Sequence, residues 1–250
     1  MDFKKEIAAG RFLSFIRDGK PIIFWDACAL LEILRIPMNT KKLDVESLKN
    51  YESLAEAIES EKVISVTSYM VGFECNNNFN QVDGALLRFD KDSKGNVIKL
   101  ASFMDDESKR NEVVNGVSNI DVLDRFYSVL KRISENTYII KYQKTLPANM
   151  KPDIIAHDRV LHKEAPASQK GEYKDCYIWA TYISIMKAGA PESNCVFFTT
   201  NTRDYKDTTT QKPFSRLESD ISFSDNVHIS FDVKYAAYLL NCVPHNPENA

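Results

Sequence analysis

The sequence predicts an α/β fold with three layers, α/β/α, in which helices cover both faces of a central, mainly parallel sheet. Short apolar runs alternate with amphipathic helical segments along the chain, and this alternation is typical of a parallel sheet. Acidic residues also follow the ends of the apolar runs. In folds of this class, ligands bind outside the carboxyl ends of the strands.

The first part of the chain predicts a strand, a helix and a second strand. The first strand is expected at residues 22–25, and the helix at 27–35 ends at Pro37. A polar amphipathic helix or pair of helices at 41–62 is expected to cover the sheet. The second strand follows at 63–66.

A helix is expected directly after the second strand, with Thr67 as its N-cap. Four of its residues recur at helical spacing, namely Met70, Phe73, Glu74 and Asn77. This pattern places Glu74 along the edge of an apolar face.

The chain is expected to form a single domain, 1–250, with an insertion at 78–135. No internal repeat or low-complexity linker divides it. Within the insertion, residues 85–103 predict a hairpin of two strands around a Lys-Gly-Asn turn, and 119–135 predict an amphipathic helix.

The last part of the chain continues the alternation. Strands are expected at 137–143, 195–199 and 227–231. Helices are expected at 174–189, which a glycine ends, and at 232–242.

The helix at 174–189 carries a carboxylate at the head of its inward face. Counting from Asp175 in helical steps gives Trp179, Tyr182 and Met186, the apolar stripe of an amphipathic helix. A buried carboxylate without a partner is costly, and the helix dipole relieves part of that cost. A bound cation would relieve more of it.

Four carboxylates from separate segments are expected to meet at one edge of the sheet. Asp26 and Asp204 follow the ends of predicted strands, and Glu74 and Asp175 come from helices that begin near the same edge if the crossovers are right-handed. Their mutual repulsion would raise some of their pKa values unless hard cations lie among them. Mg²⁺ and Mn²⁺ prefer such oxygen ligands.

Composition excludes several classes of protein. No segment approaches the roughly 20 apolar residues of a membrane helix, and the N-terminus lacks the apolar core of a signal peptide, so a cytoplasmic location is expected. Five cysteines without a close pair make neither a disulfide framework nor a zinc site. With a net charge of −3, a nucleic acid would have to be bound through a local basic patch or through cations.

Four acidic segments, taken in order, resemble the PIN domain, the nuclease fold of bacterial toxin ribonucleases and RNA-processing factors. They are IIFWDACALLE, ISVTSYMVGFE, GEYKDCYIWA and VFFTTNTRDY. Two features depart from the family pattern. Thr202 stands where the family often has an aspartate, and the long spacing between Glu74 and Asp175 matches only the larger members.

The resemblance implies a metal-dependent ribonuclease in which a cation-activated water attacks phosphorus. The implied catalytic and metal-binding residues are Asp26, Glu74, Asp175 and Asp204, which would hold one or two Mg²⁺ or Mn²⁺ ions. Thr200 and Asn201 would orient a carboxylate or contact the scissile phosphate. RNA that is single-stranded or in loops is the implied substrate, ahead of single-stranded DNA. An antitoxin or another protein partner is compatible with the resemblance.

Basic residues near the third acidic segment are the candidates for contacts with the RNA backbone. They are Arg159, Lys163, Lys170 and Lys174. Acidic residues alternate with them, so a solvated face of mixed charge explains the same pattern.

Other interpretations stay open at this point. A PIN-like domain without efficient chemistry could bind RNA or protein through the insertion, and Thr202 favours that alternative. Each acid alone could be a helix cap or a turn residue. A haloacid-dehalogenase-like phosphatase would need an aspartate at Cys28, and a calcium loop at residues 90–101 would need a glutamate at Ala101.

Overall fold

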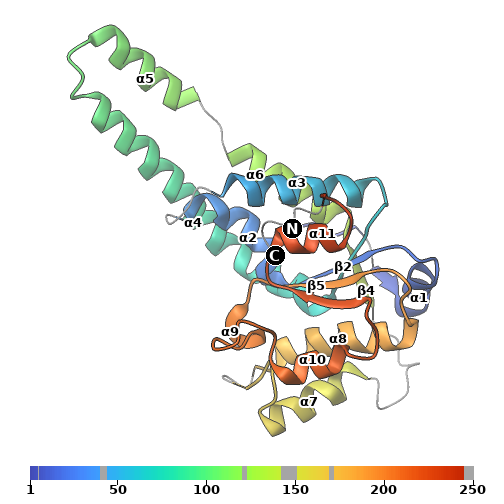
Figure 1. The fold of residues 1–250 in the computed structure, drawn as a ribbon. Helices are drawn as coiled ribbons and strands as arrows, with labels where there is room; N and C mark the ends of the chain where they lie inside the picture. The colour runs from blue at the N-terminus through green and yellow to red at the C-terminus, as the bar shows by residue number, and fades with distance from the viewer. Residues whose placement is uncertain (5, 40–43, 120–122, 142–150, 169–171, 245–250) are drawn as a thin grey trace.

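The computed structural model describes the whole chain except residues 5, 40–43, 120–122, 142–150, 169–171 and 245–250. Its centre is a six-stranded sheet in the order β1-β4-β3-β2-β5-β6, in which every neighbouring pair is parallel. The predicted three-layer α/β/α fold is therefore confirmed (Figure 1). The strands are β1 (Glu6–Ala8), β2 (Ile22–Trp25), β3 (Ile64–Ser68), β4 (Tyr138–Lys141), β5 (Cys195–Phe198) and β6 (Val227–Ser230).

Helices cover both faces of the sheet, as buried apolar strands require (Figure 1). On one side lie α2 (Ala27–Arg35), α3 (Val45–Glu59), α6 (Leu123–Glu135) and α11 (Val233–Leu239). On the other side lie α7 (Pro152–His162), α8 (Tyr173–Gly189) and α10 (Ser215–Ile221). The remaining elements are α1 (Ala9–Arg17), which contacts α8, the short 3₁₀ helix η1 (Ile36–Met38), α4 (Tyr69–Ala101), α5 (Glu107–Asn119) and α9 (Thr202–Tyr205).

Aromatic side chains fill the space between the sheet and α8. The predicted inward stripe of α8 is confirmed, because Trp179, Tyr182 and Met186 are fully buried. Trp179 meets Phe197 of β5 edge-on at 5.2 Å between ring centroids. This packing fixes the start of α8 relative to the end of β5.

Residues 85–103 do not form the predicted hairpin. α4 continues as one helix from Tyr69 to Ala101, so the strand prediction was wrong. Val82 and Leu86 are buried one turn apart, and Asp90 pairs with Lys94 at 2.9 Å in the next turn. These i,i+4 contacts stabilise a helix, whereas the β-branched residues that suggested strands carry only a weak preference.

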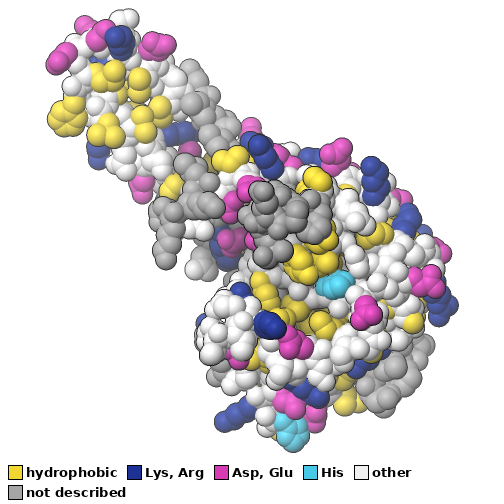
Figure 2. Space-filling model, in the orientation of Figure 1, with side chains coloured by type: hydrophobic (Ala, Val, Ile, Leu, Met, Phe, Trp, Pro, Cys, Tyr) yellow, Lys and Arg dark blue, Asp and Glu magenta, His cyan; other side chains and the backbone are white. Residues whose placement is uncertain are grey.

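α4 and α5 form a helical projection that extends away from the sheet (Figure 1). α5 returns along α4, and the two helices contact each other. Apolar side chains are visible on this projection in Figure 2. The large exposed ones are Leu87, Val97, Ile98, Leu100 and Phe103. Among the described helices, none has both the length and the apolar character that crossing a membrane would need.

Candidate active site

Asp26 lies directly after β2 and is the N-cap of α2. The backbone N–H of Ala27 donates to its Oδ1 at 2.7 Å, and the hydroxyl of Thr199 donates to its Oδ2 at 2.6 Å. The pKa of Asp26 is raised to about 6, because burial and the charge of Glu74 together outweigh the opposing effect of these hydrogen bonds. Asp26 is thus both a cap and a buried carboxylate beside other acids.

Thr199 is a site residue that sequence reasoning missed. It was expected to be the last residue of a strand, but β5 ends at Phe198 and pairs in register with β2. The Thr199 side chain therefore lies beside Asp26, and its oxygen also accepts a bond from the Asn201 N–H at 3.0 Å. A threonine directly after an aromatic strand was the available signal.

Glu74 lies in the second turn of α4, which begins at the carboxyl end of β3. The N-cap is Ser68, whose hydroxyl accepts from the Val71 N–H at 3.3 Å, so the prediction of Thr67 as the cap was wrong by one residue. Thr67 instead belongs to β3. The Glu74 side chain is 15% exposed, and its Oε1 lies 2.7 Å from the Lys174 ammonium.

Asp175 lies in the first turn of α8. Because α8 leads back to the amino end of β5, its own beginning lies at the carboxyl edge of the sheet. The residue is only 6% exposed, and its carboxylate makes no hydrogen bond or ion pair among the described residues. Burial, followed by the charges of Asp26 and Glu74, raises the pKa of Asp175 to about 8.

Asp204 lies in α9 and is buried. Its Oδ2 accepts from the Asn201 side-chain amide at 2.9 Å and from the Arg203 guanidinium at 3.0 Å. This contact is compatible with one of the two roles expected for Asn201, which is to orient a carboxylate. Thr200 is partly exposed and lines a small pocket with Tyr51 and Phe198.

The four acids act on one another electrostatically. The charges of Asp26, Glu74 and Asp204 each raise the pKa of Asp175. The structure also shows a limit to this convergence: among the described residues, no three acidic, histidine or cysteine side chains lie close enough to share one cation. In this conformation Glu74 is bound to Lys174, and Asp204 is bound to Arg203.

A comparison with protein families found a match to this chain. A sequence model described as the PIN domain matches residues 23–205. The chain belongs to the PIN domain family. The matched stretch contains all four acids, and the fold is the nuclease-like fold of that family. The comparisons with curated proteins and with solved structures found no match to this chain.

PIN domains typically use divalent metals, and the donors in this PIN domain fit such an ion. All four acids offer carboxylate oxygens, the ligands that Mg²⁺ and Mn²⁺ prefer. Asp175 is the decisive residue, because a buried carboxylate without a partner is costly and a cation would remove that cost. A shared ion would require Glu74 to exchange Lys174 for the metal.

Arg159 does not lie on the surface of this PIN domain, and its prediction as an RNA contact was wrong. It is 3% exposed and donates to the backbone oxygen of Ala165 and to the carboxylate of Asp220. Trp179 donates to the same carboxylate at 2.7 Å. Because α7 packs against α8, this face of α7 points inward, and Arg159 becomes a buried ion-pair partner.

The other predicted basic residues have different positions. Lys163 is exposed at the left-handed C-cap of α7, with a φ of 52°. Lys174 lies at the site, paired with Glu74. Lys170 lies outside the described residues.

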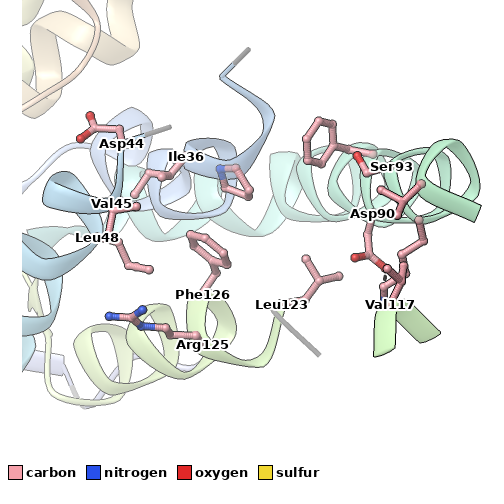
Figure 3. Close-up of a pocket in the computed structure, with 14 residues that line it drawn as sticks. Ile36, Asp44, Val45, Leu48, Asp90, Ser93, Val117, Leu123, Arg125 and Phe126 are labelled. Atoms are coloured by element: carbon pink, nitrogen blue, oxygen red, sulfur yellow. Dashed lines mark ion pairs between the residues drawn. The ribbon is translucent and has the colours of Figure 1, made fainter. Parts of the chain in front are cut away.

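A separate apolar pocket of about 430 Å³ lies at the base of the α4–α5 projection (Figure 3). Ile36, Leu48, Leu123 and Phe126 contribute to its wall. None of the four site acids lines it. Its chemistry is therefore distinct from that of the carboxylate site.

Proposed function

We propose that this PIN domain is a metal-dependent ribonuclease that hydrolyses phosphodiester bonds in RNA. One observation supports this most strongly: Asp175 is 6% exposed, its carboxylate has no hydrogen-bond partner among the described residues, and the charges of Asp26, Glu74 and Asp204 raise its pKa. Such a residue destabilises a protein that has no ligand for it. A divalent cation is the ligand that its chemistry favours.

The proposed roles are those that the resemblance to the family implies for each acid. Asp26, Glu74 and Asp175 would hold one or two Mg²⁺ or Mn²⁺ ions, with Asp204 completing the set directly or through water. Such an ion supplies an activated water and neutralises charge on the phosphate and on the leaving oxygen. Thr199 already holds the Asp26 carboxylate in one orientation, by its 2.6 Å hydrogen bond.

Substrate binding would use the exposed groups around these acids. Thr200 and Asn201 are proposed to contact the scissile phosphate or orient a carboxylate, and Lys163, Lys170 and Lys174 to contact the RNA backbone. Because the net charge is −3, these lysine side chains have to supply the attraction for the RNA phosphates. Single-stranded RNA or RNA loops suit this site better than a regular duplex.

We also propose a cytoplasmic location and leave an antitoxin or another protein as a candidate partner. All five cysteines are free thiols, and four have pKa values raised by burial to about 11 or 12. Free, protonated thiols are typical of a reducing compartment. Localisation by fluorescence microscopy of the tagged chain would test this.

The deciding experiment is a cleavage assay on matched RNA and single-stranded DNA oligonucleotides with Mn²⁺, Mg²⁺ or EDTA. Wild-type protein is expected to cut RNA only with a divalent cation, and Asp175→Asn is expected to be inactive. Products with internal cleavage sites would indicate an endonuclease. Equal cutting by wild type and Asp175→Asn would contradict the proposal, because it would trace the activity to another protein.

A second candidate is a non-catalytic PIN domain that binds RNA or protein. Two observations favour it: no three described side chains of metal-binding type lie within reach of one cation, and the α4–α5 projection exposes large apolar residues such as Leu100 and Phe103. Absence of RNA cleavage with Mn²⁺, unchanged by Asp26→Asn, would support this candidate.

A further inference from the structure

Lys174 links two of the elements that build the site. It lies at the start of α8, next to Asp175, and its ammonium nitrogen reaches Oε1 of Glu74 on α4 at 2.7 Å. A second, longer contact of 3.7 Å joins it to Glu172. The side chain therefore crosses from α8 to α4 beside the acids, with 45% of its surface exposed.

This contact places a positive charge on a proposed metal ligand. Glu74 is 15% exposed while Lys174 is 45% exposed, so the pair lies at the mouth of the site with its carboxylate turned inward. A divalent cation would bind the same carboxylate, so the Lys174 ammonium group and the metal compete for the negative charge of Glu74.

The charges of the neighbouring acids explain why a lysine would be held there. Asp26, Asp175 and Glu74 repel one another, and a protein without a bound cation needs another positive group among them. Arg203 occupies the corresponding position on Asp204, with a contact of 3.0 Å. The positive side chains of Lys174 and Arg203 reduce the repulsion between the acids but leave Asp175 unpaired.

We propose that Lys174 is the resident counter-ion of Glu74 and that a divalent cation has to displace it to complete the site. This inference rests on the proposed function. It makes Lys174 a positioning residue that sets the affinity for the metal, in addition to any contact with RNA. It also accounts for the absence of a three-ligand group in the described conformation, since Glu74 is engaged elsewhere.

The test measures Mn²⁺ affinity by electron paramagnetic resonance and the melting temperature of the cation-free protein. Lys174→Met is expected to bind Mn²⁺ roughly fivefold more tightly, the factor that an ion pair of ordinary strength is worth. Lys4→Met is the matched control. It removes a Lys–Glu pair of 3.6 Å between Lys4 and Glu61, which lie next to the amino ends of β1 and β3, and should leave Mn²⁺ affinity unchanged.

A double-mutant cycle separates direct competition from a general effect of charge. In a Glu74→Gln background, Lys174→Met should no longer tighten Mn²⁺ binding, because the contested oxygen has lost its charge. A gain that persists in this background, or equal affinities of Lys174→Met and wild type, would overturn the inference. If wild type binds no Mn²⁺ at all, the proposed function itself fails.

The melting temperature provides an answer even if Glu74→Gln binds Mn²⁺ too weakly to measure. Without cations, Lys174→Met should melt at a lower temperature than wild type, since Glu74 then faces the other acids without a counter-ion. The same substitution should have no such effect in the Glu74→Gln background. An unchanged melting temperature in the wild-type background would overturn the inference.

Discussion

Two buried carboxylates beside α8 differ in how their charge is balanced. Asp220 has a side chain 10% exposed and is bound by Arg159 and by the Trp179 indole. Asp175, one helical turn before Trp179, is 6% exposed, but the described residues give its carboxylate neither a donor nor a cation. Burial alone therefore does not distinguish the two acids, whereas the missing counter-charge marks Asp175 as the candidate ligand of a cation.

The largest expected effect is the loss of RNA cleavage in Asp175→Asn. Removing one carboxylate of the proposed metal site should lower kcat/KM by roughly 10³-fold, because a catalytic cation supplies several kcal/mol of charge stabilisation. The cation-free variant should nevertheless be more stable than wild type, since a buried like charge is removed. Cleavage assays and thermal melts of the same preparation check both results.

Asp220→Asn is the matched control for that prediction. It makes the same change from aspartate to asparagine, but at the acid that is paired with Arg159. It should therefore weaken the fold while leaving Mn²⁺ affinity unchanged. If Asp175→Asn destabilised the cation-free protein as strongly as Asp220→Asn does, the two acids would not differ in the way the contacts indicate.

The second prediction concerns Arg159, the positive charge that balances Asp220. Arg159→Met should lower the free energy of unfolding by about 3–5 kcal/mol, because it leaves Asp220 buried without its cation. Urea denaturation measures the loss. Mn²⁺ affinity of the folded variant should stay within twofold of wild type, and a large change in that affinity would show that Arg159 serves the acid site after all.

The third prediction follows from the raised pKa values of the site. The pKa rises from an ordinary 3.8 to about 8 for Asp175 and to about 6 for Asp26, so the folded state binds these protons more tightly than the unfolded state. Stability of the cation-free protein should therefore fall as pH rises from about 4 to about 8, lowering the melting temperature on the order of 5–10 °C.

Melting curves across this pH range, with EDTA, check the prediction. Asp175→Asn should flatten the dependence, and so should saturating Mn²⁺, which binds the deprotonated carboxylates. A wild-type protein whose melting temperature rises over the same range would show that the acids are already balanced by positive charge in the folded state.

Much of the acid site could be predicted from the sequence because each acid has a local marker. Asp26 follows an apolar strand directly, and Asp175 begins a helix whose inward stripe is aromatic. Strand ends of a parallel sheet share one edge, so the positions of these acids follow from topology. Their roles as metal ligands stay a prediction.

The features that were missed depend on packing between distant segments. Arg159 lies on α7, a helix that was not predicted, and only its contact with α8 shows that this face is buried. Likewise, the pairing of Lys174 with Glu74 joins residues 100 positions apart. The long α4 was mistaken for a hairpin because Val97 and Ile98 favour strands locally, while the stabilising contacts are between successive helical turns.

The smallest effect is predicted for Thr199→Val, which tests whether Oδ2 of Asp26 has to be held in place. Thr199→Val keeps the side-chain volume but removes the hydroxyl that donates to Asp26 at 2.6 Å. Mn²⁺ affinity and cleavage should each fall about tenfold, the effect typical of groups that orient metal ligands. Thr137→Val, at a buried threonine next to the amino end of β4 that donates to Ile133, is the matched control. If both variants lost the same activity, the loss would reflect weaker packing, and the Thr199 hydroxyl would have no specific role at the site.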